Sequence, residues 1–390
     1  MNKNILIVLN SPYLGGAERS IIHQSSIIES NHNVTFFIPY LYSLQEETLD
    51  ISTHIKNHSR GNIKYFNYPP TLYKLSRSSK LMAFVLPLFF LPKIFITLKK
   101  NHITKYQIVW ANGNKVGVIL YLWCMINSYS GKFIWHFRDY PKTTGIYKLL
   151  WKIFNFQHAF SLTIIGNSYS VSRAIKQITS PICQIKTLYN PVGIYLPNVK
   201  PNRTKKTLGI IAMMAPWKGL HNILVWTSLF EKELIDIEID SILIFGDDIY
   251  KTEGEHNNYA LQLKQLLIKF PSKLIKFKGI VPPDEIYPQI DILIHPTINM
   301  EPFGRVIIEA FSSGTPVIST AKGGALELID NNISGLIYDP FDNHGLFLAV
   351  KSLVTNAETY NRIQRGAKEK LKIIETCFYQ QLEQIINNEK

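Results

Sequence analysis

The chain has 390 residues, of which 46% are hydrophobic and 18% are charged. This composition excludes an intrinsically disordered protein, and the length is sufficient for two domains of ordinary size. The three cysteines, Cys124, Cys183 and Cys377, show neither a disulfide pattern nor metal-ligand spacing. We therefore expect a protein of the reducing cytoplasm.

Short apolar runs alternate with longer helical segments along the first half of the chain. A strand is expected at residues 4–9 and a helix at residues 18–28. Further strands are expected at residues 34–38, 108–111, 132–135 and 162–165. This alternation predicts an α/β fold with a parallel sheet covered by helices on both faces.

The formal net charge of +13 is concentrated in the first half. Residues 1–200 contain 22 Lys and Arg against 6 Asp and Glu, whereas residues 201–390 contain 20 against 23. From Ile51 to Arg138 there is no acidic residue at all. The asymmetry predicts an anionic partner. No nucleic-acid-binding module is recognisable, so an anionic membrane surface is favoured over nucleic acid.

The segment from Leu81 to Leu98 is apolar and aromatic, but two prolines and Lys93 interrupt it. A regular spanning helix is therefore not expected. Basic residues flank the segment: Lys74, Arg77, Lys80, Lys99 and Lys100. Two interpretations stay open: a segment that enters one leaflet of a membrane at its interface, and a buried helix pair of the first domain.

The second half repeats the alternation of strands and helices. Strands are expected at residues 207–212, 241–245, 275–277, 292–294 and 317–319. Between the halves, residues 190–201 contain three prolines and a glycine, which is typical of an interdomain linker. The chain contains no G-x-G-x-x-G motif and no P-loop, which disfavours a dehydrogenase and a P-loop ATPase.

Two carboxylates, Glu301 and Glu309, lie eight residues apart across a Phe-Gly turn. The preceding run predicts a strand and a loop, and the following run predicts a helix that ends before Gly314. The first turn of a helix presents unpaired N–H groups and the positive end of the helix dipole, which suits a phosphate or a sugar hydroxyl. Carboxylates accept several hydrogen bonds, so they suit the hydroxyls of ribose and pyranose rings.

The string Glu-Pro-Phe-Gly-Arg-Val-Ile-Ile-Glu-Ala, followed by Gly314-Thr-Pro-Val-Ile-Ser and Gly323-Gly324, closely resembles the E-x7-E signature of the retaining glycosyltransferases of family 4. The resemblance implies the GT-B architecture, in which two Rossmann-like domains face a central cleft. We accordingly expect an acceptor- and membrane-facing domain at 1–195 and a nucleotide-sugar-binding domain at 196–368. A helix at 369–390 is expected to cross back to the first domain.

The resemblance also implies site residues in the first domain. Gly15 and Gly16 match the glycine-rich first loop, where the missing Cβ allows a ligand to approach the backbone. His136 matches a cleft histidine that contacts the donor sugar, and the adjacent Arg138 and Asp139 either orient it or pair with each other.

In the second domain, Lys218 matches the phosphate loop and would neutralise the donor diphosphate. The arginine that usually precedes this lysine is replaced by Ala212 and Met213, and Arg305 is a candidate to supply its charge. Glu309 is expected to bind the ribose. Glu301 and the N–H groups of Phe303 and Gly304 are expected to bind the donor sugar.

The expected activity is transfer of a sugar, with retention, from a nucleotide diphosphate sugar to a lipid-linked or glycan acceptor at the inner face of the membrane. No cofactor is expected. No metal is expected either, because Lys218 and the helix dipole offer charge compensation, so Asp247 and Asp248 are read as part of a strand-end loop. Another GT-B enzyme, such as a nucleotide-sugar epimerase or a phosphorylase, and a non-catalytic nucleotide-sugar-binding subunit stay open as alternatives.

Overall fold

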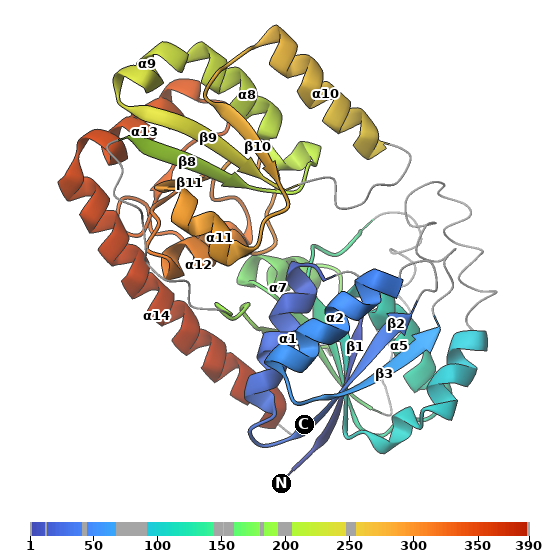
Figure 1. The fold of residues 1–390 in the computed structure, drawn as a ribbon. Coiled ribbons are helices and arrows are strands. Elements are labelled where there is room, and N and C mark those ends of the chain that lie inside the picture. The colour runs from blue at the N-terminus through green and yellow to red at the C-terminus, as the bar shows by residue number, and fades with distance from the viewer. Residues whose placement is uncertain are drawn as a thin grey trace. The chain divides into compact units, whose positions relative to one another are not determined.

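The computed structural model describes residues 2–11, 14–40, 45–67, 92–143, 151, 160–179, 183–193, 205–246 and 255–387. The chain divides into two compact units. The first contains Met1–Gly193 together with Phe378–Lys390, and the second contains Ile194–Cys377. Figure 1 shows the course of the chain through both.

Seven parallel strands form the sheet of the first unit, in the order β3-β2-β1-β4-β5-β6-β7. The strands are β1 (Asn4–Leu9), β2 (Asn33–Tyr40), β3 (Asn62–Asn67), β4 (Ile108–Asn112), β5 (Lys132–Phe137), β6 (Ser161–Gly166) and β7 (Gln184–Thr187). Strand order reverses beside β1, because β2 pairs with one of its edges and β4 with the other. This order is typical of the Rossmann fold.

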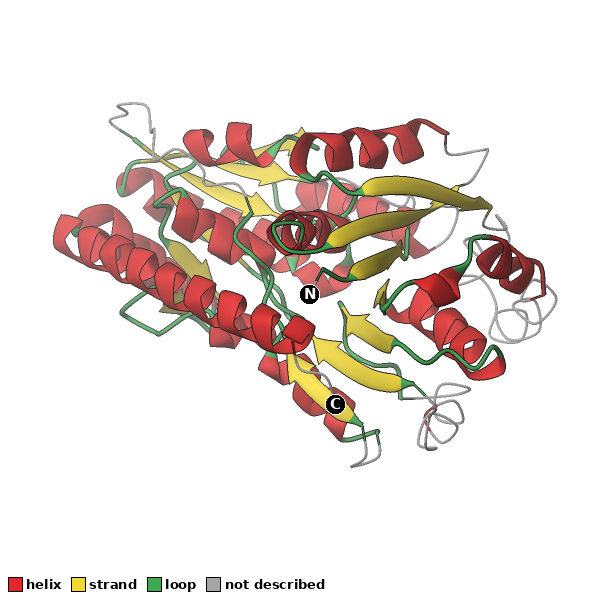
Figure 2. Ribbon diagram, turned by 90° about the horizontal axis from the view of Figure 1, so that it is seen from below, coloured by secondary structure: helices red, strands yellow, loops and turns green. Residues whose placement is uncertain are grey.

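Helices connect these strands: α1 (Gly16–Ile28), α2 (Gln45–His58), the 3-10 turn η2 (Ile103–Lys105), α5 (Asn114–Ile126) and α7 (Tyr169–Lys176). Crossovers between parallel strands are right-handed, so α1 and α2 cover one face of the sheet, and α5 and α7 cover the other. Figure 2 shows helices on both sides of the strands.

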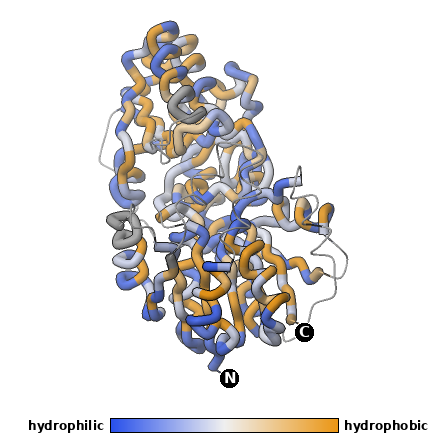
Figure 3. The backbone as a smooth tube through the Cα atoms, turned by 90° about the vertical axis from the view of Figure 1, so that its right-hand side faces the viewer, coloured by the Kyte–Doolittle hydropathy of each residue, from blue (hydrophilic) through white to orange (hydrophobic). Residues whose placement is uncertain are grey.

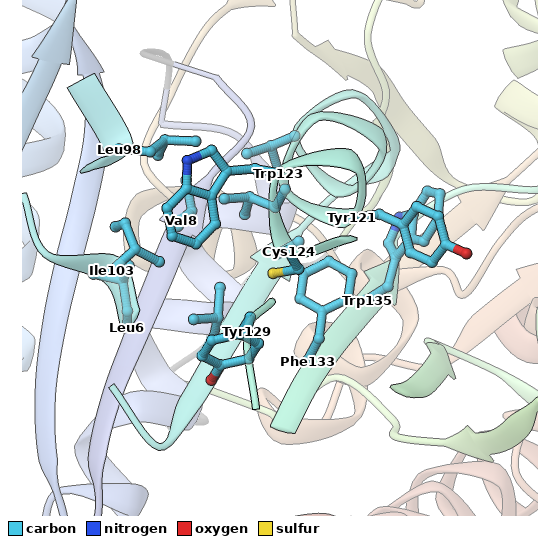
Figure 4. Close-up of a cluster of buried hydrophobic side chains, with 14 of the residues drawn as sticks. Leu6, Val8, Leu98, Ile103, Tyr121, Trp123, Cys124, Tyr129, Phe133 and Trp135 are labelled. Atoms are coloured by element: carbon cyan, nitrogen blue, oxygen red, sulfur yellow. The ribbon is translucent and has the colours of Figure 1, made fainter. Parts of the chain in front are cut away.

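The core of the first unit is unusually aromatic. Trp110, Trp123, Trp135, Phe133 and Tyr121 are each at most 1% exposed. Figure 3 shows many hydrophobic residues, in orange, along the tube of this unit, which contains the N-terminus. In Figure 4 the ring of Tyr121 lies beside Trp135, and their ring centroids are 6.2 Å apart. Burial of rings of this size makes a large contribution to the stability of this unit.

The described end of the apolar segment at 81–98 belongs to this core. Residues 92–100 are helical, and Ile94 and Leu98 are almost fully buried, whereas Ile96 is 55% exposed. Figure 4 shows Leu98 beside the indole of Trp123. Residues 81–91 lie outside the described residues, as do Lys74, Arg77 and Lys80. No helix in the described ranges is long and apolar enough to cross a membrane.

Six parallel strands form the sheet of the second unit, in the order β10-β9-β8-β11-β12-β13. They are β8 (Lys206–Ile211), β9 (Ile239–Phe245), β10 (Ile275–Gly279), β11 (Ile292–His295), β12 (Val317–Ser319) and β13 (Leu336–Ile337). Again the order reverses at the first strand, here β8, which pairs with β9 and β11. The second unit therefore repeats the Rossmann order of the first.

The helical elements of the second unit are η3 (Pro216–Lys218), α8 (Leu220–Leu229), α9 (Glu231–Asp236), α10 (Glu255–Lys269), α11 (Pro283–Ile286), η4 (Tyr287–Gln289), α12 (Arg305–Ser312), η5 (Gly324–Glu327), α13 (Asn343–Thr355) and α14 (Ala357–Asn387). The residues of α14 up to Cys377 belong to the second unit, and those from Phe378 onward belong to the first. Trp226 of α8 is fully buried in the core, and its Nε1 donates to the carbonyl of Asn343 at 3.0 Å.

The α/β fold class and the parallel sheets predicted from the sequence are confirmed. Each apolar run predicted as a strand lies within a strand or reaches one residue beyond it. Three strands were not predicted, namely β3, β7 and β13. All three lie at the edge of a sheet.

Candidate functional site

The predicted motif residues of the second unit gather at the carboxyl ends of its strands. The loop after β8 carries Lys218, the loop after β11 carries Glu301, and the loop after β12 carries Gly323 and Gly324. Because β8 and β11 are the neighbours at which strand order reverses, these loops flank the topological switch point. Open α/β sheets bind their ligands at this place.

A glycine turn brings the loop after β8 against the loop after β11. Gly219 has φ = 72°, a left-handed conformation that favours glycine. A Cβ atom at Gly219 would lie 2.1 Å from the carbonyl oxygen of Pro296, so no other residue fits. The amide of Ile298 also donates to the carbonyl of Trp217 at 2.9 Å. The position of Lys218 is therefore fixed by backbone contacts on both sides of it.

Lys218 and Glu301 form an ion pair. Nζ of Lys218 donates to Oε2 of Glu301 at 2.6 Å, and the two side chains are only 18% and 12% exposed. Burial opposes ionisation of the carboxyl, but His295 and Lys218 outweigh it and hold the pKa of Glu301 well below its usual range. Glu301 is therefore an anion at every physiological pH.

The backbone of Glu301 is held as firmly as its side chain. Its N–H donates to the carbonyl of Lys322 at 3.2 Å, and its carbonyl accepts from Gly324 at 2.7 Å. These bonds form a short parallel bridge between Glu301 and Gly323. The Gly-Gly pair predicted to accompany the motif thus anchors the loop that carries the first carboxylate.

Gly304 makes the turn between this loop and α12. Its φ of 94° is left-handed, and helix α12 begins at the next residue. Phe303 is 2% exposed and anchors the turn in the core. The N-terminus of α12 consequently lies at the same sheet edge as Lys218 and Glu301.

Glu309 lies in the middle of α12 and is paired within the unit. Nε of Arg305 donates to its Oε1 at 2.7 Å, and the hydroxyl of Tyr287 donates to its Oε2 at 3.2 Å. Burial and the neighbouring carboxylate raise the pKa of Tyr287 well above its usual value, so Tyr287 stays a neutral donor. Arg305 thus fixes the second carboxylate, a contact that its spacing of four residues allows.

The sequence missed three residues that contact the glutamates: His295 and Thr297 lie beside Glu301, and Tyr287 contacts Glu309. His295 and Thr297 flank a proline, and Tyr287 is the first residue of the 3-10 turn η4. The only indication in the sequence was their position close to the predicted strand at 292–294 and to the motif that follows it. Their contacts depend on tertiary structure.

In the first unit, Gly15 directly precedes α1 and Gly16 is its first residue, at the switch point beside β4. Oε2 of the nearby Glu18 lies 3.0 Å from the place of a Cβ on Gly15. Glu18 is 5% exposed, and burial raises the pKa of its carboxyl to about 7, despite the opposing charge of Arg138.

Arg138 links four elements of the first unit. Its guanidinium donates to the side-chain oxygens of Asn112, Asn190 and Gln24, at 2.6, 2.8 and 3.2 Å. Its carbonyl accepts from Asn167 at 3.1 Å. These partners come from β4, from the segment after β7, from α1 and from the segment after β6.

His136 is fully buried at the end of β5, with an exposed fraction of 0%. Neither ring nitrogen has a hydrogen-bond partner within the part of the chain that the structure describes. Burial, followed by the charge of Arg138, lowers the pKa of the imidazole well below its usual value, so the ring is neutral. A sugar contact requires this enclosure to open, and that role stays a prediction.

Asp247 and Asp248 lie outside the described residues, as do residues 194–201 of the expected linker. Within the described ranges, no group of three or more His, Cys, Asp or Glu side chains is arranged to hold a metal ion. Of the charged groups predicted from the motifs, the structure places Lys218, Glu301, Arg305 and Glu309 in the loops and the helix that follow the strands of the second sheet. Lys322 lies in the same loops, and its Nζ donates to the carbonyl of Ile298 at 3.2 Å.

Residues 196–370 match the model of the family described as glycosyl transferases group 1. The matched residues lie within the second unit. Lys218, Glu301 and Glu309 all lie among the matched residues. The match supports a glycosyltransferase of the GT-B type.

Two relatives differ in how much of the chain they share. A putative glycosyltransferase of Bacillus subtilis, YtcC, is 24% identical over 176 residues, which is 44% of this chain and 42% of that protein. An uncharacterised 42.6 kDa protein in the cps region of Klebsiella pneumoniae is 26% identical over 362 residues, which is 83% of this chain and 87% of that protein. The alignment with the first thus covers less than half of its length.

The fold is similar to that of solved glycosyltransferases along the whole chain. Anabaena Alr3699/HepE, crystallised with UDP and glucose, superposes with a TM-score of 0.76 at 19% identity, over 98% of this chain and 99% of that one. Its complex with UDP-glucose gives a TM-score of 0.75. At this identity the likeness establishes the fold, which is that of two Rossmann-like domains.

Proposed function

We propose that this chain is a retaining glycosyltransferase of family 4 that transfers a sugar from a nucleotide diphosphate sugar to a membrane-associated, lipid-linked or glycan acceptor. The observation that carries the proposal is the meeting of Lys218 and Glu301 at the switch point of the second sheet, with a bond of 2.6 Å. A fixed cation and a fixed anion side by side suit a ligand that carries both phosphate and hydroxyl groups.

Lys218 binds the diphosphate in this proposal. Its ammonium has three N–H donors, so it can keep Glu301 and still donate to a phosphate oxygen. The first turn of α12 adds backbone N–H groups and the positive end of the helix dipole. Together these groups stabilise the negative charge that grows on the leaving diphosphate.

The two glutamates bind different parts of the donor beside the diphosphate. Glu309, already oriented by Arg305 and Tyr287, binds the ribose hydroxyls through its remaining lone pairs. Glu301 and the backbone of Phe303 and Gly304 bind the donor sugar. Arg305 acts through Glu309, because its Nε donates a hydrogen bond to the Glu309 carboxylate.

Retention follows from attack on the face of the sugar from which the diphosphate departs. The leaving phosphate oxygen then takes the proton of the acceptor hydroxyl. The protein stabilises an oxocarbenium-like sugar and the departing diphosphate with preorganised charge. The family resemblance further assigns Gly15, Gly16 and His136 to donor binding in this proposal, and the basic first half attracts the enzyme to the inner face of a membrane.

The test is incubation of the protein with a panel of radiolabelled nucleotide sugars, beginning with UDP-glucose, in the presence of extracted membrane lipids. Transfer of label to a lipid or glycan, with the anomeric configuration of the donor, supports the proposal. A product of inverted configuration refutes retention. Conversion of the nucleotide sugar without an acceptor indicates an epimerase, a requirement for inorganic phosphate indicates a phosphorylase, and binding without turnover indicates a non-catalytic subunit.

A further inference from the structure

His295 is the last residue of β11 and lies directly behind the Glu301 carboxylate. It is 3% exposed. Its Nδ1 lies 3.0 Å from the hydroxyl oxygen of Ser319, which is its register partner on β12. Its Nε2 lies 3.2 Å from the hydroxyl oxygen of Thr297 and 3.6 Å from Oε2 of Glu301. The imidazole thus connects a neighbouring strand to the carboxylate.

Hydrogen bonds run in a row from Ser319 through His295 and Thr297 to Glu301, and the donors and acceptors along this row have a defined direction. The backbone N–H of Ala321 donates to the hydroxyl oxygen of Ser319 at 2.9 Å. Ser319 can then donate its own proton to Nδ1 of His295, which places the imidazole proton on Nε2, facing Thr297. The hydroxyl of Thr297 in turn donates to Oε2 of Glu301 in a long bond of 3.5 Å.

The opposite direction satisfies fewer groups. If Nδ1 carried the proton, the Ser319 hydroxyl would have no acceptor among its contacts in the described structure, and Thr297 would donate to His295 instead of Glu301. A buried hydroxyl without an acceptor is costly. The Nε2–H form of the ring uses every hydroxyl proton in the row and directs the last one onto an anion.

We propose that His295 and Ser319 are positioning residues for the proposed transfer: they direct a row of hydrogen bonds, through Thr297, onto Oε2 of Glu301 and so set the plane of the carboxylate that holds the donor sugar. This inference rests on the proposed function for its catalytic consequence. The hydrogen-bond direction itself depends only on the geometry of the second unit.

The row has a task that Lys218 alone does not fulfil. Oε2 accepts from Lys218 on one side and from the row on the other. When a diphosphate binds, the ammonium of Lys218 is shared between Glu301 and a phosphate oxygen. His295 is the last residue of strand β11, and the row reaches Glu301 through Thr297 and not through Lys218. The row therefore keeps the carboxylate oriented while the ammonium of Lys218 also binds the ligand.

The first experiment reads the imidazole directly and needs no ligand. In protein labelled with ¹⁵N-histidine, the signals of one of the 11 histidines are assigned to His295 by their loss in His295→Gln. We expect the proton on Nε2 rather than on Nδ1, and loss of this preference in Ser319→Ala. Ser352→Ala, on α13, is the matched control and leaves the ring unchanged. A ring protonated on Nδ1, or no change in Ser319→Ala, overturns the inference.

The second experiment measures kinetics with UDP-glucose, or with the donor that the panel identifies. His295→Ala should lower kcat about 10- to 100-fold, because a small misplacement of a reacting group has an effect of this size. KM for the donor and the affinity for UDP should stay within about twofold. His295→Gln, which keeps an N–H donor near the place of Nε2, should recover part of kcat.

The outcomes separate the two proposals. Full kcat in a folded His295→Ala, or an equal loss in His295→Ala and His295→Gln, overturns the positioning role. Absence of transfer by the wild-type protein overturns the proposed function, while the histidine spectra still decide the direction of the hydrogen bonds. Circular dichroism and thermal unfolding show whether each variant is folded.

Discussion

Glu301 and Glu309 carry the same functional group, but the structure gives each a different cation and a different hydroxyl. Glu301 pairs with Lys218 and lies beside Thr297, whereas Glu309 pairs with Arg305 and Tyr287. A planar guanidinium and a phenol hold a carboxylate rigidly, and a lysine ammonium on a flexible stem can be shared with a ligand. This difference supports assigning Glu309 to a fixed part of the donor and Glu301 to the reacting part.

Glu309→Ala should weaken binding of UDP-glucose, because it removes the acceptor proposed for the ribose hydroxyls. Polar groups left unpaired in a site cost about 1–3 kcal/mol, which corresponds to a loss of roughly 5- to 150-fold in affinity. Isothermal titration calorimetry measures the change, with the exposed Glu358→Ala as the control. Wild-type affinity in Glu309→Ala would remove Glu309 from the donor site.

Glu18 predicts a pH-dependent stability. The folded-state pKa of about 7 lies above the ordinary 4.5, so the folded protein holds this proton more tightly than the unfolded chain does. Its contribution to stability is complete below about pH 4.5 and is lost as pH rises through about 7. The loss amounts to about 3 kcal/mol by pH 8.

Glu18→Gln removes this pH-dependent contribution to stability, because glutamine cannot ionise. In urea unfolding between pH 5 and pH 8, the free energy of unfolding of the variant should increase relative to that of the wild type as pH rises. Glu358→Gln, which is exposed on α14, should show no such trend. A wild-type stability that does not fall relative to Glu18→Gln over this range would show that Glu18 has an ordinary pKa.

At the scale of elements, the end of α14 is held by an unusual cap. Lys3, Lys132 and Lys186 donate to the carbonyls of Ile386, Ile385 and Gln384, at 3.2, 2.5 and 2.9 Å. All of these groups belong to the first unit. The last carbonyls of a helix lack partners and carry the negative end of its dipole, so three ammonium groups satisfy both needs.

Replacing Lys3, Lys132 and Lys186 together with glutamine should loosen the end of α14. Each charge at a helix terminus contributes about 0.3–1 kcal/mol, so we expect a combined loss of about 1–3 kcal/mol. Hydrogen exchange of the last turn of α14 should accelerate, whereas Lys372→Gln on the same helix should change nothing. Unchanged exchange in the triple variant would mean that the buried Ile385 and Phe378 hold the helix without the lysines.

At the scale of the whole molecule, charge is the most asymmetric property. The first 200 residues have a balance of +16 and the remainder −3. We expect binding to vesicles that contain anionic lipid, because each basic residue near such a surface contributes about 1 kcal/mol, screened over about a Debye length. Binding should strengthen with the anionic fraction and weaken with salt.

The membrane prediction can be tested by replacing the basic residues that flank the apolar segment, namely Lys74, Arg77, Lys80, Lys99 and Lys100. Neutral replacements should lower vesicle flotation and leave UDP-glucose binding unchanged, because none of these five residues is among the proposed donor-binding groups. Phe84, Phe89 and Phe90 should leave a salt-resistant remainder. Wild-type protein that does not float with anionic vesicles at low salt would favour an acceptor that is not in a membrane.

The charge compensation at the second sheet also predicts the response to chelators. Lys218 and the first turn of α12 should balance the diphosphate without a divalent ion, so transfer should persist in excess EDTA. The control is the same assay with added Mg²⁺ or Mn²⁺. Activity that disappears in EDTA and returns with either ion would assign a metal role to Asp247 and Asp248.

The sequence by itself determined the two sets of parallel strands, because central strands buried on both faces are continuous apolar runs. It also determined two turns of the candidate site, since the left-handed backbone at Gly304 and the close approach at Gly219 permit hardly any residue but glycine. The edge strands β3, β7 and β13 escaped prediction, because strands at a sheet edge are short or alternate polar residues with apolar ones.

Only the tertiary structure decided which side chains meet. His295 and Ser319 are 24 residues apart, and Lys218 and Glu301 are 83 residues apart. Their contacts come from the register of β11 with β12 and from the pairing of β8 with β11. Likewise, Arg138 follows His136 by two residues, yet its partners come from α1, β4 and the segment after β7. A local pattern specifies an element, but hydrogen bonds between elements depend on strand order and register, which long-range packing determines.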